Sequence, residues 1–311
     1  MQYGYSMPKQ MRGHLKPLAT ASLLLCALTC AAPKTPTIDP AVHFNQVETW
    51  RAERMAALTK PDGWPSLVAL HWLQEDVETF GSSSTADLVL PGDDDSIWGR
   101  LVTEEGRVRL EADPSSGITQ ADGTPVESLE LVSDIDGEPT MLQRGPIQFY
   151  LINRTGELAI RAKNLNWIDD QGLPHIESFP VDSSYRVTAR WLPYDPPKPI
   201  PVLNIVGQRA DQDSPGAIEF EIDGKTYRLD ALYTPERMFL IVGDRSNGDT
   251  TYGGGRYLYA GPVVNGKVVV DFNLLYNPPC VFTEFATCEL PPQQNKLPIA
   301  LPVGEKYSGE H

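Results

Sequence analysis

The chain has 311 residues and a formal net charge of −15, from 41 acidic and 26 basic side chains. Because phosphates are repelled by an acidic surface, this balance argues against nucleic acid and anionic lipid as partners, and solubility is its simplest role. The length suffices for a sizeable core in one or two domains, and 28 prolines with 25 glycines favour many short strands joined by turns.

The first 29 residues have the pattern of a secretory signal peptide. Three basic residues precede an apolar run at 18–28, which is too short to span a bilayer. The A-L-T-C sequence that ends at Cys30 resembles a bacterial lipoprotein box, although Thr29 stands where Gly, Ala or Ser is usual. We therefore predict export to the periplasm or cell envelope, with a lipid anchor at Cys30 or plain secretion as alternatives. That anchor would be the protein's one contact with a membrane.

After the leader, residues 30–42 predict an extended tether, because prolines stiffen this segment. His43–Thr59 has apolar residues at helical spacing and predicts the one N-terminal helix, which a Pro-Asp-Gly turn ends. Trp64–Leu73 is an apolar run that predicts a strand. His71 lies inside this run and is expected to be a core or edge residue rather than a metal ligand.

Short strand patterns with glycine-containing turns follow from Thr79 and predict an antiparallel sandwich. Gly81, Asp87 and the L-V-L-P motif at 88–91 resemble the opening of a forkhead-associated sandwich. That fold holds phosphothreonine with an arginine beside the first glycine and a Ser/His pair. Here Ser82 replaces the arginine, and G-R at 99–100 is not followed by histidine. The resemblance therefore implies the shape of this unit and not phosphopeptide binding.

A second β unit is predicted beyond the sandwich. The proline-rich segment 193–199 is interpreted as a stiff connector with a domain boundary near residue 197, which gives units of 43–197 and 198–311. Further β runs and an Asp-Gly turn at 223–224 favour an antiparallel sandwich or barrel. The predicted fold class is mainly β, with two packed antiparallel units and one N-terminal helix.

The stretch 251–288 concentrates polar side chains beside apolar strands. Asn-Gly at 265–266 is a strong signal for a two-residue hairpin, because both positions need positive φ, and the valines at 268–270 predict a buried strand. We predict that this stretch forms a pocket for a small polar or anionic ligand. Its predicted ligand-binding residues are Tyr252, Arg256, Asp271, Asn273, Tyr276, Asn277 and Thr283. No cofactor and no metal site are predicted.

Several of these residues have a second interpretation. Arg256 can bind a carboxylate or phosphate with two hydrogen bonds, or it can pair with Asp271 across the hairpin. The tyrosines can stack on a sugar or pack on the sheet. A carboxylate pair such as Asp271 with Glu284 would suit a hydrolase of envelope glycans or esters, which is one alternative function. A scaffold that binds a protein partner through the N-terminal sandwich is another.

Cys280 and Cys288 are eight positions apart. In an oxidising compartment they can form a disulfide that closes a small loop. Two reduced, buried cysteines and half of a soft-metal site are the alternatives.

Several sequence blocks occur in a characteristic order. They are P-D-G-W-P-S-L-V-A-L-H-W-L, F-P-V-D-S-S-Y-R-V, T-Y-G-G-G-R-Y-L-Y-A and D-F-N-L-L-Y-N-P-P-C-V-F-T-E-F-A-T-C. In this order they resemble a bacterial family known only as domain of unknown function sixteen-eighty-four, over about residues 45–306. Pro65 stands where that family usually shows leucine. The resemblance implies a β-rich fold without an assigned activity or cofactor, so whether the protein is an enzyme stays open.

Overall fold

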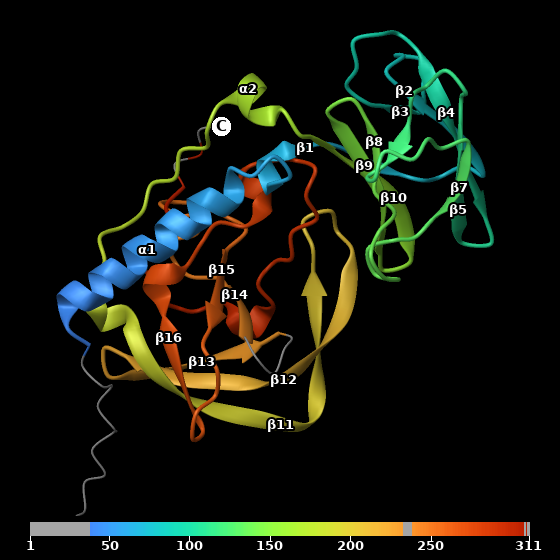
Figure 1. Ribbon diagram of the computed structural model, residues 1–311. Helices are drawn as coiled ribbons and strands as arrows, with labels where there is room; N and C mark the ends of the chain where they lie inside the picture. Colours follow the sequence, from blue (N-terminus) through green and yellow to red (C-terminus); the bar gives the residue numbers. More distant parts are fainter. Residues whose placement is uncertain (1–37, 233–237, 308, 310–311) are drawn as a thin grey trace, which may run out of the picture. The chain divides into compact units, whose positions relative to one another are not determined.

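The computed structural model describes residues 38–232, 238–307 and 309. The predicted signal peptide, Cys30 and most of the predicted tether lie outside the described residues. Within them the chain is mainly β, with four sheets and two α-helices, which confirms the predicted fold class (Figure 1). No helix in this described part combines the length and the apolar character that crossing a membrane requires.

The N-terminal helix begins earlier than predicted. α1 spans Pro40–Leu58 rather than His43–Thr59, because the Asp39 carboxylate caps the free amides of Ala41 and Val42. Proline suits the first helical position, where its missing N–H costs no hydrogen bond.

A second α-helix and five 3₁₀ turns lie among the described residues. α2 spans Trp167–Gln171, and the 3₁₀ turns are η1 (Trp64–Ser66), η2 (Ser183–Tyr185), η3 (Phe272–Leu274), η4 (Pro279–Val281) and η5 (Gln293–Asn295). The strand predicted from Trp64 therefore begins only at Leu67, since η1 with Pro65 takes its first turn.

Ten strands form a sandwich of two five-stranded sheets. One sheet has the order β1 (Leu67–Trp72), β10 (Glu157–Asn164), β9 (Ile147–Arg154), β8 (Leu142–Arg144) and β6 (Thr119–Gln120). The other has the order β3 (Leu88–Val89), β2 (Val77–Gly81), β4 (Ile97–Glu104), β5 (Arg107–Ala112) and β7 (Ser128–Leu131). All pairs are antiparallel except β2 with β3.

The sandwich core lies between these two sheets. Phe80 of β2 and Phe149 of β9 pack with their ring centroids 5.7 Å apart, and Trp98 is fully buried beside them. Buried and exposed residues alternate over Arg107–Leu110 of β5, as the pleat requires, whereas Ala159–Ala162 of β10 are all buried because both faces of that strand are covered. The likeness to a forkhead-associated sandwich stays a prediction.

The C-terminal half contains a four-stranded sheet and a two-stranded sheet. Their orders are β13 (Lys225–Ala231), β12 (Arg209–Ile222), β11 (Arg186–Leu203), β16 (Lys267–Asp271), and β14 (Met238–Val242), β15 (Arg256–Ala260). Figure 1 shows that the long strands β11 and β12 bend together. Buried side chains of both sheets form one core, with Leu229, Leu258 and Val270 completely enclosed.

The proline-rich segment 193–199, interpreted as a stiff connector, lies inside β11. The β11–β12 ladder shifts register between Pro193 and Lys198, where prolines have no N–H to donate, and it then resumes. The domain boundary predicted near residue 197 stays a prediction.

The predicted Asn-Gly turn is present. Asn265 and Gly266 have φ of 51° and 71°, as a type I′ turn requires, and Val264 and Lys267 on either side exchange two main-chain hydrogen bonds. Beyond this bridge, β15 pairs with β14 and β16 pairs with β11. Asp223 and Gly224, also with φ of 51° and 71°, connect β12 and β13, which pair with each other from the turn onward.

Candidate functional site

Arg256, the strongest predicted anion ligand, is fully buried in the C-terminal core. Its Nη2 donates to Asp244 Oδ2 at 2.9 Å and to the carbonyl of Leu301 at 2.8 Å, and its Nη1 donates to the carbonyl of Glu305 at 3.2 Å. The pairing with Asp271 that was its structural alternative is therefore wrong. On β15, Arg256 shares a face with the buried Leu258, which turns its guanidinium toward the interior. Through these bonds Arg256 holds residues 301–307, which we call the C-terminal segment, against β15.

Asp271 and Asn273 lie together in a different network. Asp271 Oδ2 is 2.6 Å from Nε2 of His43 on α1, and His43 is buried. Asp271 Oδ1 accepts hydrogen bonds from the main-chain and side-chain nitrogens of Asn273, at 3.1 and 2.8 Å. Asn273 Oδ1 in turn accepts from the amide of Asp182. These groups join α1 and the segment before β11 to the end of β16.

Of the other predicted residues, Tyr276 and the adjacent Asn277 both contact Arg54 of α1, whereas Tyr252 and Thr283 lie elsewhere. Tyr276 packs under the Arg54 guanidinium, 4.5 Å from the ring centroid, and desolvation raises the pKa of Tyr276. The hydroxyl of Thr283 donates to the carbonyl of Leu67 at 3.3 Å. Tyr252 packs edge-on against Tyr307.

Asn277 lies near the C-terminal segment. Its main-chain N–H donates to the side-chain carboxylate of Glu305, and its side-chain Nδ2 donates to the main-chain carbonyl of Lys306. Of the seven predicted residues, the structure thus brings Asp271 and Asn273 into contact, and it links Asn277 to Arg256 through Glu305. Ligand binding at these seven positions stays a prediction.

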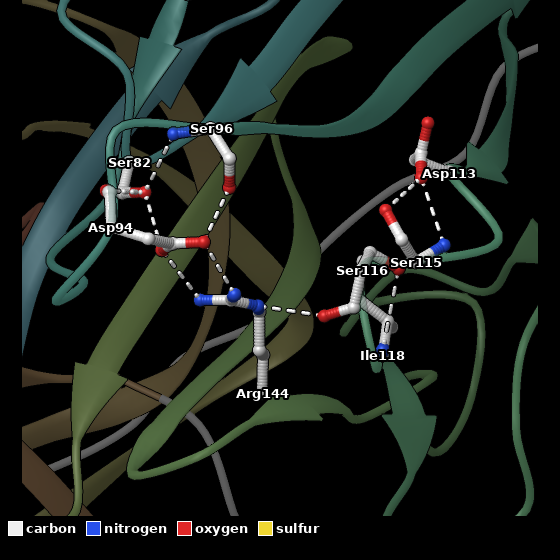
Figure 2. Close-up of polar contacts among 8 residues, drawn as sticks. All are labelled: Ser82, Asp94, Ser96, Asp113, Ser115, Ser116, Ile118 and Arg144. Carbon is white, nitrogen blue, oxygen red and sulfur yellow. Dashed lines mark hydrogen bonds and ion pairs between the residues drawn. The ribbon is translucent and has the colours of Figure 1, made fainter.

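One corner of the sandwich, which includes Ser82 of the predicted forkhead-associated motif, holds a network of internal polar contacts (Figure 2). Arg144 forms two hydrogen bonds with Asp94, at 2.9 and 3.2 Å, and donates through Nε to the carbonyl of Ser116. The hydroxyls of Ser96 and Ser82 donate to the same Asp94 carboxylate. The corner therefore already contains its own anion.

This corner leads to a prediction about acid stability. Hydrogen bonds from Ser96, Ser82 and Arg144 lower the pKa of Asp94 below its ordinary value of 3.8. A lowered carboxyl pKa contributes stability that is present above that ordinary value and is lost as the pH falls below it. We expect Asp94→Asn to lower stability at neutral pH and to reduce the further loss below about pH 4. Urea unfolding at several pH values measures both effects, with the exposed neighbour Asp93→Asn as control.

Cys280 and Cys288 form a disulfide, with 6.1 Å between their Cα atoms. The amide of Cys280 also donates to Sγ of Cys288. We call residues 280–288 the cysteine loop. Its last residues, Ala286 to Cys288, line a cavity of about 520 Å³.

We call this space the Arg161 cavity. Its walls come from β9 and β10, from β12, from β15 and from the cysteine loop, and its polar and aromatic lining includes Arg154, Arg161, Gln212, Tyr257, Tyr259 and Thr287. Tyr257 and Tyr259 alternate with Arg256 along β15 and so occupy its opposite face. β15 and the cysteine loop, which both belong to the stretch of the predicted site, thus line one cavity together. The side chains that they contribute to it differ from the predicted ligand-binding residues.

Arg161 is the unusual residue of this cavity. It is only 2% exposed, and its Nη2 donates to Thr287 Oγ1 at 3.1 Å, whereas Nε has no hydrogen-bond partner. Among the described residues it forms no ion pair within 4.0 Å. Burial lowers the pKa of Arg161, because the charged form is desolvated. Among the described residues, this buried cation therefore has no carboxylate within ion-pair distance.

Arg154, the neighbouring arginine, is bound differently. Its guanidinium forms two hydrogen bonds with Asp134, at 2.7 and 3.0 Å, and a longer one with Thr287 Oγ1 at 3.3 Å. Thr287 is thus the point where both guanidinium groups meet. Arg154 thus has a carboxylate at hydrogen-bond distance, whereas Asp134 acts on Arg161 only at longer range.

The opposite wall supplies an acceptor and apolar rings. Gln212 Oε1 is buried and has no hydrogen-bond partner within the described part of the chain, while its Nε2 donates to the Glu289 carboxylate. The hydroxyl of Tyr257 donates to the carbonyl of Glu289 at 2.9 Å, and its ring packs edge-on against Phe239. Such a wall suits an anion that also carries an apolar body and a hydrogen-bond donor.

Sequence reasoning did not find Arg161 or His43. The one signal for Arg161 was a charged residue in the middle of the otherwise apolar run L-A-I-R-A, which becomes β10. For His43 the only signal was a histidine at the start of the predicted helix. In both cases the partner is far away in the chain.

Comparisons with known proteins support the family resemblance and add no function. Residues 171–306 match the family described as protein of unknown function DUF1684, which confirms the predicted resemblance over this range. The solution NMR structure of an uncharacterised protein from Haloarcula marismortui is 28% identical, covers 46% of this chain and 80% of its own, and has a TM-score of 0.38. No curated protein matches the chain significantly.

Proposed function

We propose that this protein binds a small anionic ligand in the Arg161 cavity, without chemical turnover. The observation that carries the proposal is the buried guanidinium of Arg161, which lacks a carboxylate partner among the described residues. A buried charge without a partner costs several kcal/mol, and a carboxylate or phosphate from a ligand would offset this cost. Guanidinium groups bind both kinds of anion with two hydrogen bonds.

The rest of the cavity agrees with a ligand that is small and partly apolar. About 520 Å³ lies within the usual range of small-molecule sites. The rings of Tyr257 and Phe239 offer an apolar wall. Gln212 Oε1, which has no partner among the described residues, can accept a hydrogen bond from a donor on the ligand. Because the overall charge of −15 would repel anions, binding depends on this local cation. On the leader pattern alone, we propose the cell envelope as the place where the protein acts.

Calorimetric titration with benzoate, phenyl phosphate and the uncharged benzamide tests the proposal. We expect saturable binding of at least one anion and none of benzamide. Arg161→Gln should weaken anion binding by about 10- to 100-fold, because a hydrogen bond to a charged group contributes about 1.5–3 kcal/mol.

Arg107→Gln is the matched control, since Arg107 is an exposed arginine of the sandwich and lies outside the cavity. Equal affinity in the wild type and in Arg161→Gln would place any anion site elsewhere and end the proposal. Thr287→Val, which keeps the shape but removes the shared acceptor, should change the affinity by a smaller factor.

A further inference from the structure

A second cavity has the opposite chemistry. It measures about 920 Å³ and lies among α2, the segment that follows it, the cysteine loop and the C-terminal segment. We call it the Asn277 cavity. The lining residues that the argument uses are Phe179, Asp249, Asn277, Phe282 and Lys306.

Two acceptors of this cavity have no partner among the residues that the structure describes. Asn277 is 2% exposed, and its Oδ1 accepts no hydrogen bond from them, although its Nδ2 donates to the carbonyl of Lys306. Asp249 is exposed, and its carboxylate forms no ion pair or hydrogen bond with another described residue. An unfilled buried acceptor is costly, so a donor that reaches Asn277 from the cavity would be favoured.

The structure already seats an ammonium group in this cavity. The Lys306 Nζ lies 5.1 Å from the centroid of the Phe179 ring and 3.8 Å from a carboxylate oxygen of Glu177. Aromatic faces and carboxylates attract cations together, since both present negative charge. Phe282 adds a second ring to the lining.

From these observations we propose that the Asn277 cavity binds a ligand with a primary ammonium group on an apolar body. Both unfilled groups accept hydrogen bonds, and an ammonium offers three donors and a positive charge. An anion is disfavoured here, because Asp249 and Glu177 carry two negative charges against the single charge of Lys306. This proposal is independent of the Arg161 cavity.

Calorimetric titration of the full chain with benzylamine tests it, with benzyl alcohol as the uncharged probe of similar shape. We expect saturable binding of benzylamine and no binding of benzyl alcohol. Asp249→Asn should weaken the binding by up to about fivefold, the effect of one partly exposed ion pair, whereas Asp93→Asn should not change it. Arg161→Gln should also leave benzylamine binding unchanged.

A second variant distinguishes binding of an ammonium ligand from binding of an anion at Lys306. Lys306→Met removes a positive charge that repels the ammonium of the ligand and leaves Glu177 and Phe179 without their cation, so benzylamine should bind more tightly. If benzylamine binding is absent, insensitive to Asp249→Asn or weakened by Lys306→Met, the proposal is overturned. Saturable binding of benzoate that Lys306→Met abolishes would also overturn it, because Lys306 would then hold an anion.

Discussion

Arg256→Met is expected to lower the free energy of unfolding by about 3–5 kcal/mol, the usual cost of removing one partner of a buried ion pair. Both side chains of the Arg256–Asp244 pair are completely buried, so the Asp244 carboxylate would be left inside the core without its cation. The carbonyls of Leu301 and Glu305 would lose their donor at the same time. Urea unfolding at neutral pH measures the loss.

Two further variants make this experiment specific. The double variant Arg256→Met, Asp244→Asn should recover part of the lost stability, because it removes the stranded charge. Arg161→Gln should leave the unfolding free energy unchanged or raise it, since Arg161 has no ion pair to lose among the described residues. A loss below about 1 kcal/mol for Arg256→Met would contradict the role of the Arg256–Asp244 pair as a clamp.

The opposite expectations for two buried arginines follow from their partners. Arg256 completes a network that the fold itself supplies, so its removal damages the fold. Arg161 has no ion pair among the described residues, and the ligand that we propose would supply the missing anion. Comparing Arg161→Gln in stability and in anion binding therefore tests the proposed function from two sides.

The double variant Cys280→Ala, Cys288→Ala is expected to lower the free energy of unfolding by about 2.5 kcal/mol, because the disulfide closes a short loop and restricts the unfolded chain. Anion binding should weaken as well, because Thr287 sits directly beside Cys288 and accepts from both Arg154 and Arg161. Thermal unfolding with and without reductant measures the first effect.

Reductant should lower the melting temperature of the wild type and leave that of the double variant unchanged. If the wild-type melting temperature is the same before and after its thiols become titratable, the disulfide does not stabilise the fold. The alternative of two reduced cysteines that only fill space predicts that result.

Part of the fold could be predicted because its signals are local. Positive φ at Asn265-Gly266 and Asp223-Gly224 is a property of those residues, and the β-branched valines of β16 favour a strand whatever surrounds them. The helix at α1 was predicted for the same reason, and its start was misplaced by three residues because the Asp39 cap was overlooked.

The predicted pairing of Arg256 with Asp271 failed for a non-local reason. It assumed that strands on either side of a turn pair with each other, whereas β15 pairs with β14 and β16 with β11. Strand alternation then puts Arg256 in the core and Tyr257 in the Arg161 cavity. Sequence alone does not say which face of a strand meets which sheet.

From the sequence alone came the mainly β architecture, the turn positions, the close spacing of the two cysteines and the family resemblance, since each depends on neighbouring residues. The tertiary structure decided where the chemistry lies. His43 meets Asp271 across 228 positions, and Arg161 meets Thr287 across 126. Contacts of this range depend on how sheets stack and which strand faces they bury, and no spacing within a single element encodes that choice.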